Sequence, residues 1–79
     1  MQIDEDKIDD AVLALLHLTA FEDHGVVRSW KSHDWGALER LHTKGFISNP
    51  QSKAKSVVLS EDGARRSKEL FEQLFKKAG

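Results

Sequence analysis

The sequence predicts a small α+β domain, and two observations lead to this prediction. Apolar residues recur at helical spacing near both ends of the 79-residue chain, while the middle holds short β-branched runs bounded by glycine, asparagine and proline. A chain this short buries only about 60% of the surface that its unfolded form exposes, so it holds one domain with a modest core. We therefore expect residues 1–79 to form three helices and a small two- or three-stranded antiparallel sheet.

The first helix is predicted over about residues 4–20. Its carboxylates come first, where a helix N-terminus favours negative charge. Its apolar stripe follows the helical period and comprises Ile8, Val12, Leu15 and Leu16. Asp23-His24-Gly25 is a turn signal, and the β-branched and aromatic run 26–30 suits a short strand.

The middle helix has two candidate N-caps, Ser32 and Asp34. Trp35, Leu38 and Leu41 are its apolar positions. Gly45 supplies the left-handed residue that commonly ends a helix, and the next residue, Phe46, falls where it can contact the last turn.

A hairpin and a third helix complete the prediction. Residues 46–48 suit a strand that ends at Asn49-Pro50, because proline cannot donate to a sheet ladder. Residues 56–59 suit the returning strand, and the polar tip between them carries Lys53 and Lys55. Ser60 is the N-cap of the last helix, whose stripe includes Ala64, Ser67, Leu70, Phe71, Leu74 and Phe75.

Charge is distributed unevenly along the chain. Residues 1–27 carry one lysine against seven acids, whereas residues 28–55 carry six Lys or Arg against two acids. Net charges of −6 and +4 follow, although the whole chain carries only −1. Such asymmetry indicates an anionic partner for the basic part, which holds the middle helix and the hairpin tip.

Several classes of protein are not expected. No apolar run approaches the ~18 residues that span a bilayer, so we expect a soluble, cytoplasmic protein without a membrane partner. The chain has no Cys and no His-x-x-x-His pair, and its acidic N-terminal run lacks the glycine of a calcium loop. No phosphate-binding loop or nucleophile elbow occurs, so we expect no enzyme activity, metal or cofactor.

Two segments resemble winged-helix transcription regulators of the MarR and PadR type. Those proteins carry a leucine-rich recognition helix ending in Gly-Leu-Ile, then Leu-Thr-Glu-Glu-Gly after the wing; the matching segments are Leu38–Ile47 and Leu59–Gly63. Phe46, Ser60 and Asp62 are mild departures from that pattern. The resemblance implies a winged-helix-like fold.

Nearly the whole chain also resembles a small bacterial family of unknown function, which implies no activity. The segments that carry this second resemblance are Ile3–Asp10, Trp30-Lys31, Asp34-Trp35 and Lys53–Gly63.

One departure from the winged-helix pattern affects the functional prediction. A helix-turn-helix needs a positioning helix directly before its recognition helix, but residues 21–32 hold a turn and a strand-like run. The basic face nevertheless makes nucleic-acid binding the first hypothesis, with Arg40 reaching a base edge and the lysines contacting phosphates. The candidate residues are Arg28, Lys31, Arg40, Thr43, Lys44, Lys53 and Lys55. Trp30 and Trp35 are candidates for stacking on bases, or for packing.

The last helix offers a candidate dimer seam. Its apolar stripe is wide for so small a domain, although packing against the first helix would also explain it. The candidate seam residues are Leu70, Phe71, Leu74 and Phe75. Two functions therefore stay open, a homodimeric nucleic-acid-binding or regulatory module, and a protein-interaction module that keeps the fold without binding DNA. Acids from residues 4–10 interrupting the basic face would favour the second.

Overall fold

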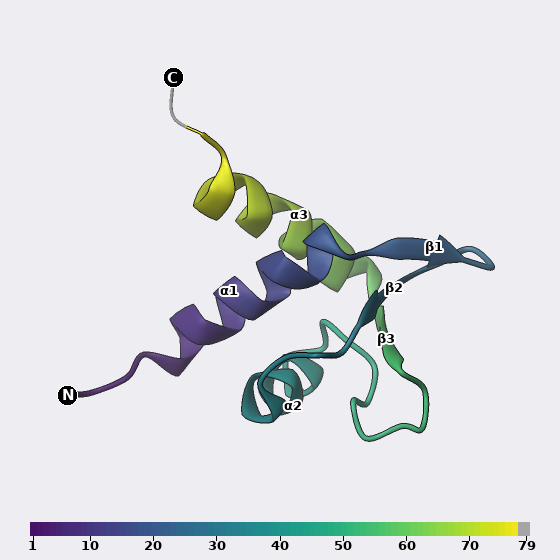
Figure 1. Cartoon of the computed structure of the whole chain (residues 1–79), viewed down its shortest axis with the longest axis horizontal. Helices are drawn as coiled ribbons and strands as arrows, with labels where there is room; N and C mark the ends of the chain where they lie inside the picture. The colour runs from purple at the N-terminus through teal and green to yellow at the C-terminus, as the bar shows by residue number, and fades with distance from the viewer. Residues whose placement is uncertain (78–79) are drawn as a thin grey trace.

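The computed structural model describes residues 1–77 and has the order helix, hairpin, helix, strand, helix (Figure 1). A three-stranded antiparallel sheet accompanies the three helices, which confirms the α+β class. The elements are α1 (Glu5–Leu18), β1 (Phe21–Asp23), β2 (Val26–Trp30), α2 (Trp35–Thr43), β3 (Ser56–Leu59) and α3 (Glu61–Phe75).

The β1–β2 hairpin contains the one strand that the sequence prediction missed. Its two-residue loop consists of His24 at φ 52° and Gly25 at φ 82°. Positive φ at both central residues is the requirement of the type I′ turn, which matches the twist of paired strands. The loop thereby forces Phe21–Asp23 into pairing with β2, although a Phe-Glu-Asp run has little β propensity of its own.

The sheet has the order β1-β2-β3, with one face toward the helices. Val57 and Leu59 of β3 point inward and are buried, as the alternation in their run predicts. Ser29 of β2 is also buried, and its hydroxyl donates to the carbonyl oxygen of Leu16 in α1 at 2.7 Å. This bond ties the sheet to α1 without leaving a buried hydroxyl unpaired.

The predicted strand over residues 46–48 is reduced to a single bridge, between Ile47 and Leu59. Strand pairing stops at Ser48, whose side-chain oxygen accepts a hydrogen bond from the backbone N–H of Val58 at 2.9 Å. Pro50 follows two residues later and cannot donate to a ladder. The segment therefore lies along the free edge of β3 without forming a regular strand.

The ends of α2 follow the sequence prediction. Of its two candidate caps, Asp34 is the one used, because its carboxylate accepts the N–H of Ala37 at 3.0 Å. Gly45 has φ 83°, and the N–H of Phe46 donates to the carbonyl oxygen of Leu41 at 3.0 Å. Residues 21–32, directly before α2, hold the hairpin and no helix.

α3 begins against the end of α2, and two residues make this possible. Ser60 accepts the N–H of Gly63 at 2.9 Å as the predicted cap, while its hydroxyl donates to the carbonyl oxygen of Gly45 at 2.7 Å. A side chain at position 63 would overlap the carbonyl group of Phe46. The glycine of the Leu-Ser-Glu-Asp-Gly segment is therefore required by the close approach of two backbones.

The core lies where α1 crosses α3, between these helices, α2 and the inner face of the sheet (Figure 1). Its buried apolar members are Val12, Leu13, Ala14, Leu16, Ala37, Leu38, Leu41, Ile47, Val57, Leu59 and Leu70.

Candidate functional site

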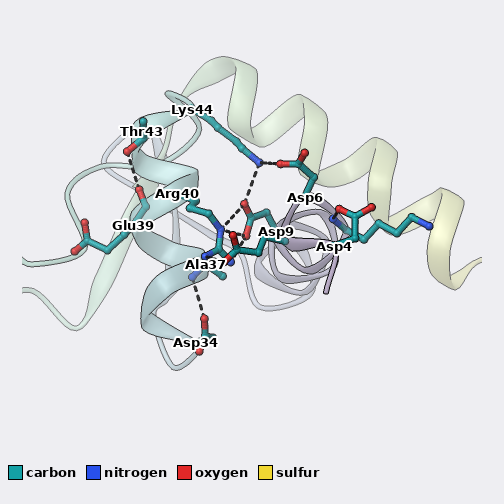
Figure 2. Close-up of polar contacts among 11 residues, drawn as sticks. Asp4, Asp6, Asp9, Asp34, Ala37, Glu39, Arg40, Thr43 and Lys44 are labelled. Carbon is teal, nitrogen blue, oxygen red and sulfur yellow. Dashed lines mark hydrogen bonds and ion pairs between the residues drawn. The ribbon is translucent and has the colours of Figure 1, made fainter. Parts of the chain in front are cut away.

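The polar feature that joins α1 to α2 is a buried carboxylate, Asp9, whose surface is 0% exposed. Nε of Arg40 donates to both Asp9 oxygens at 2.9 Å, and Nζ of Lys44 donates to Oδ2 at 2.9 Å (Figure 2). Arg40 lies in the last turn of α2, and Lys44, one turn further along the chain, is the C-cap residue of that helix. Asp9 thus receives the charge-assisted bonds that a buried carboxylate needs.

Two exposed acids of α1 complete the arrangement. Nη1 of Arg40 donates to Glu5 at 2.9 Å, and Nζ of Lys44 donates to Asp6 at 3.1 Å. These outer pairs are solvated and add little stability, whereas the Asp9 carboxylate of the inner pairs is shielded from solvent. We call Glu5, Asp6, Asp9, Arg40 and Lys44 the acid clasp; its three acids exceed its two cations by one charge.

The clasp keeps its charged form at neutral pH. Burial works to raise the pKa of Asp9, but hydrogen bonds and charge from Arg40 and Lys44 outweigh it and hold the pKa below the ordinary value of 3.8. The hydrogen bond to Asp9 raises the pKa of Lys44 above its ordinary value. Each partner therefore stabilises the ionised form of the other.

The side of α2 that points away from the core carries a carboxylate. Trp35, Glu39 and Thr43 succeed one another along it at spacings of four residues. Glu39 accepts the side-chain N–H of Gln51 at 2.8 Å, and the Thr43 hydroxyl donates to the Glu39 carbonyl oxygen at 3.1 Å. A helix that enters the DNA groove meets phosphates, and here it would present Glu39 to them.

The remaining basic candidates surround the loop of residues 49–55, which we call the tip loop. Arg28 of β2 donates from Nε to the Ser56 hydroxyl at 2.8 Å. Lys31 donates from Nζ to the carbonyl oxygens of Pro50 and Ser52 at 2.7 and 2.6 Å, so it braces the tip loop. Lys53 and Lys55 lie exposed on that loop.

The four residues of the candidate dimer seam differ in burial. Leu70 lies in the core, and the Phe71 ring packs against the His17 ring at a centroid distance of 5.3 Å. Leu74 and Phe75 are about half exposed, at 50% and 48%. α1 adds its own exposed apolar stripe of Ile8, Leu15 and Leu18.

Comparison with known sequences places the chain in a family. The model of the domain of unknown function DUF6429 matches residues 4–77, which include every residue of the clasp. The chain belongs to the DUF6429 family. The uncharacterised protein y4hR of Sinorhizobium fredii is 56% identical over 75 residues, covering 95% of this chain and 97% of that relative. No solved structure matches the chain. The predicted likeness to a small bacterial family of unknown function is thus confirmed.

Sequence reasoning did not find the role of Asp9 in this member of the DUF6429 family. It treated Asp9 as one more acid near a helix N-terminus. The spacing of residues could have revealed that Asp9 is buried, because Asp9, Leu13 and Leu16 follow the i, i+4, i+7 pattern of one helix face. A carboxylate in line with two buried leucines predicts a buried cation partner.

Within residues 1–77 of this DUF6429 chain, no group of three or more potential metal ligands comes together. Within the same range, no helix has the length and apolar character needed to cross a membrane.

Proposed function

We propose that the chain is a cytoplasmic protein-interaction module of winged-helix type, rather than an enzyme, and that α2 does not read the DNA groove. Its β2 pairs with β3, and the segment 46–48 lies on the other edge of β3, with α2 and the tip loop as the intervening connections. This arrangement supports the winged-helix interpretation, with the tip loop as the wing.

The observation that carries the proposal is the acid clasp. Arg40 of α2 and its C-cap residue Lys44, which would contact DNA, are bonded to α1 carboxylates, and one of these carboxylates is completely buried. Releasing Arg40 and Lys44 toward phosphate would leave Asp9 charged and unpaired in the interior, which is costly. Glu39 on the outward side adds repulsion toward a phosphate backbone.

The partner that we propose is a second copy of the chain, held through α1 and α3. Exposed leucine, isoleucine and phenylalanine side chains on both helices provide apolar surface that water contacts in the isolated chain. A domain of this size gains much stability from further apolar burial. The proposed contact residues are Ile8, Leu15, Leu18, Leu74 and Phe75, and the partly buried Phe71 packs against Phe75.

Light scattering coupled to size-exclusion chromatography tests the self-association. We expect about twice the 8.9 kDa chain mass for the wild type, and the single-chain mass for Leu74→Glu. Gln73→Glu is the matched control, because it adds the same charge at the neighbouring exposed position and should leave the dimer intact. A wild-type mass of one chain at every concentration would refute the homodimer.

Titration with duplex DNA at low salt tests the proposal that α2 does not read the DNA groove. We expect weak binding that Arg40→Ala does not change, because Arg40 already bonds to Asp9 and Glu5. The opposite result would be sequence-dependent duplex binding that Arg40→Ala abolishes, in a variant shown by circular dichroism to be folded. It would show that α2 reads the DNA groove and would refute this part of the proposal.

A further inference from the structure

The face of the sheet that points away from the helices carries exposed apolar side chains, Val26 and Trp30. Ser29 of β2 faces inward and bonds to α1, so the strand alternation places its neighbours Arg28 and Trp30 on the opposite side. The register adds Phe21, opposite Arg28, and Val58, also opposite Arg28 on the other flank. We call Phe21, Val26, Arg28, Trp30 and Val58 the outer sheet face.

Two aromatic rings lie together on this face. The centroids of Phe21 and Trp30 are 5.1 Å apart, with an angle of 36° between the ring planes. Trp30 remains 51% exposed, although burying an indole is one of the larger gains available to a small domain. The Phe21 ring contacts the indole, and about half of the Trp30 surface stays accessible to a ligand.

The charges around these rings are positive at one end of the face. Arg28 lies on β2 opposite Phe21, and its Nε donates to the Ser56 hydroxyl. Lys53 and Lys55 lie exposed on the tip loop beyond Trp30. The backbone N–H of Lys31 bonds to the carbonyl oxygen of Lys55 at 3.3 Å, which brings the tip loop alongside the end of β2. Among the described strand residues, the carboxylate on this face is Asp23, at the opposite end.

We propose that the outer sheet face binds single-stranded nucleic acid, with an unpaired base stacked on Trp30 and phosphates contacted by Arg28, Lys53 and Lys55. Open aromatic rings combined with cations are what sequence-tolerant single-strand binding requires. A duplex keeps its bases stacked inside and cannot offer one to the indole. This surface is separate from the α1–α3 contact, so the inference does not rest on the homodimer.

Fluorescence anisotropy of a labelled oligothymidylate of about ten nucleotides tests the proposal. We expect Trp30→Ala to weaken binding roughly tenfold, because one base loses its stacking partner. Trp30→Phe should restore most of the affinity, since it keeps an aromatic face. Trp35→Ala is the matched control: Trp35 is equally exposed, at 51%, but lies on α2, and its loss should leave binding unchanged.

Salt dependence separates stacking from simple charge attraction. Three phosphate contacts to a single strand give a slope of roughly −2 in a plot of log affinity against log salt. The double variant Lys53→Gln and Lys55→Gln should reduce that slope to about −0.7, the value for one contact.

Each of the following outcomes would overturn the proposal: no binding at low salt, equal affinity for the Trp30→Ala variant, or complete competition by polyphosphate or by a duplex of the same length. A Trp30→Ala variant that loses self-association would assign this face to the second copy instead, and would also overturn it. Leu74→Glu should bind the oligonucleotide as a single chain, so failure of the dimer and failure of this proposal are distinguishable.

Discussion

Replacing Asp9 by Asn keeps the side-chain volume and removes the charge that the acid clasp shares. A hydrogen bond to a charged group contributes about 1.5–3 kcal/mol to stability. Asp9 receives such bonds from both Arg40 and Lys44, but these side chains are 30% and 35% exposed, so solvent compensates part of their loss. Glu5 and Asp6 also remain as partners for the two cations.

We therefore expect Asp9→Asn to lower the free energy of unfolding by about 2 kcal/mol, which is the contribution of one charge-assisted hydrogen bond rather than of two. For a domain of this size, that corresponds to a fall in Tm on the order of 10 °C. Urea denaturation followed by tryptophan fluorescence measures the change, with a lower midpoint and an unchanged slope as the expected pattern.

Asp6→Asn is the matched control for this experiment. Asp6 also bonds to Lys44, but its side chain is 85% exposed, and the loss of such a surface pair costs at most about 1 kcal/mol. Equal stabilities of the Asp9→Asn and Asp6→Asn variants would show that burial does not strengthen the clasp. An Asp9→Asn variant as stable as the wild type would refute the structural role of Asp9.

Two further changes have defined outcomes. Gly63→Ala should destabilise the chain by about 3 kcal/mol or prevent folding, because its methyl group would overlap the Phe46 carbonyl; thermal denaturation measures this, and wild-type stability would contradict the close approach. The pKa of Asp9 is lower in the folded chain than in the unfolded one, so its contribution is present above about pH 4 and is lost as pH falls through the folded pKa. Urea midpoints between pH 7 and pH 3 should therefore fall more for the wild type than for Asp9→Asn, and parallel curves would contradict this linkage.

The features that the sequence predicted correctly are those set by neighbours within about one helical turn. Asp34 and Ser60 cap helices whose N–H groups lie three residues away, and Gly45 adopts the backbone angle that few other residues tolerate. The alternation of residues 56–59 likewise needs only local information. Each of these predictions follows from a rule about short sequence separations.

The clasp could not be predicted in the same way, because its bonds join residues 31 to 38 positions apart. Local spacing placed Arg40 on the polar side of α2, which is correct, but polar sides also face other helices. Whether Arg40 meets solvent or a carboxylate depends on the crossing of α1 and α2 (Figure 2). Strand β1 is a similar case, since its pairing depends on the turn and on Phe21 meeting Trp30.

The short strand β1 determines how long the contact between Phe21 and Trp30 on the outer sheet face lasts. β2 pairs with a neighbour on each side, whereas β1 pairs with β2 alone and spans three residues. Local opening therefore starts at β1, and its amide protons should exchange with solvent before those of β2 and β3. Each opening separates Phe21 from Trp30, so the lifetime of the hairpin limits the lifetime of the aromatic pair.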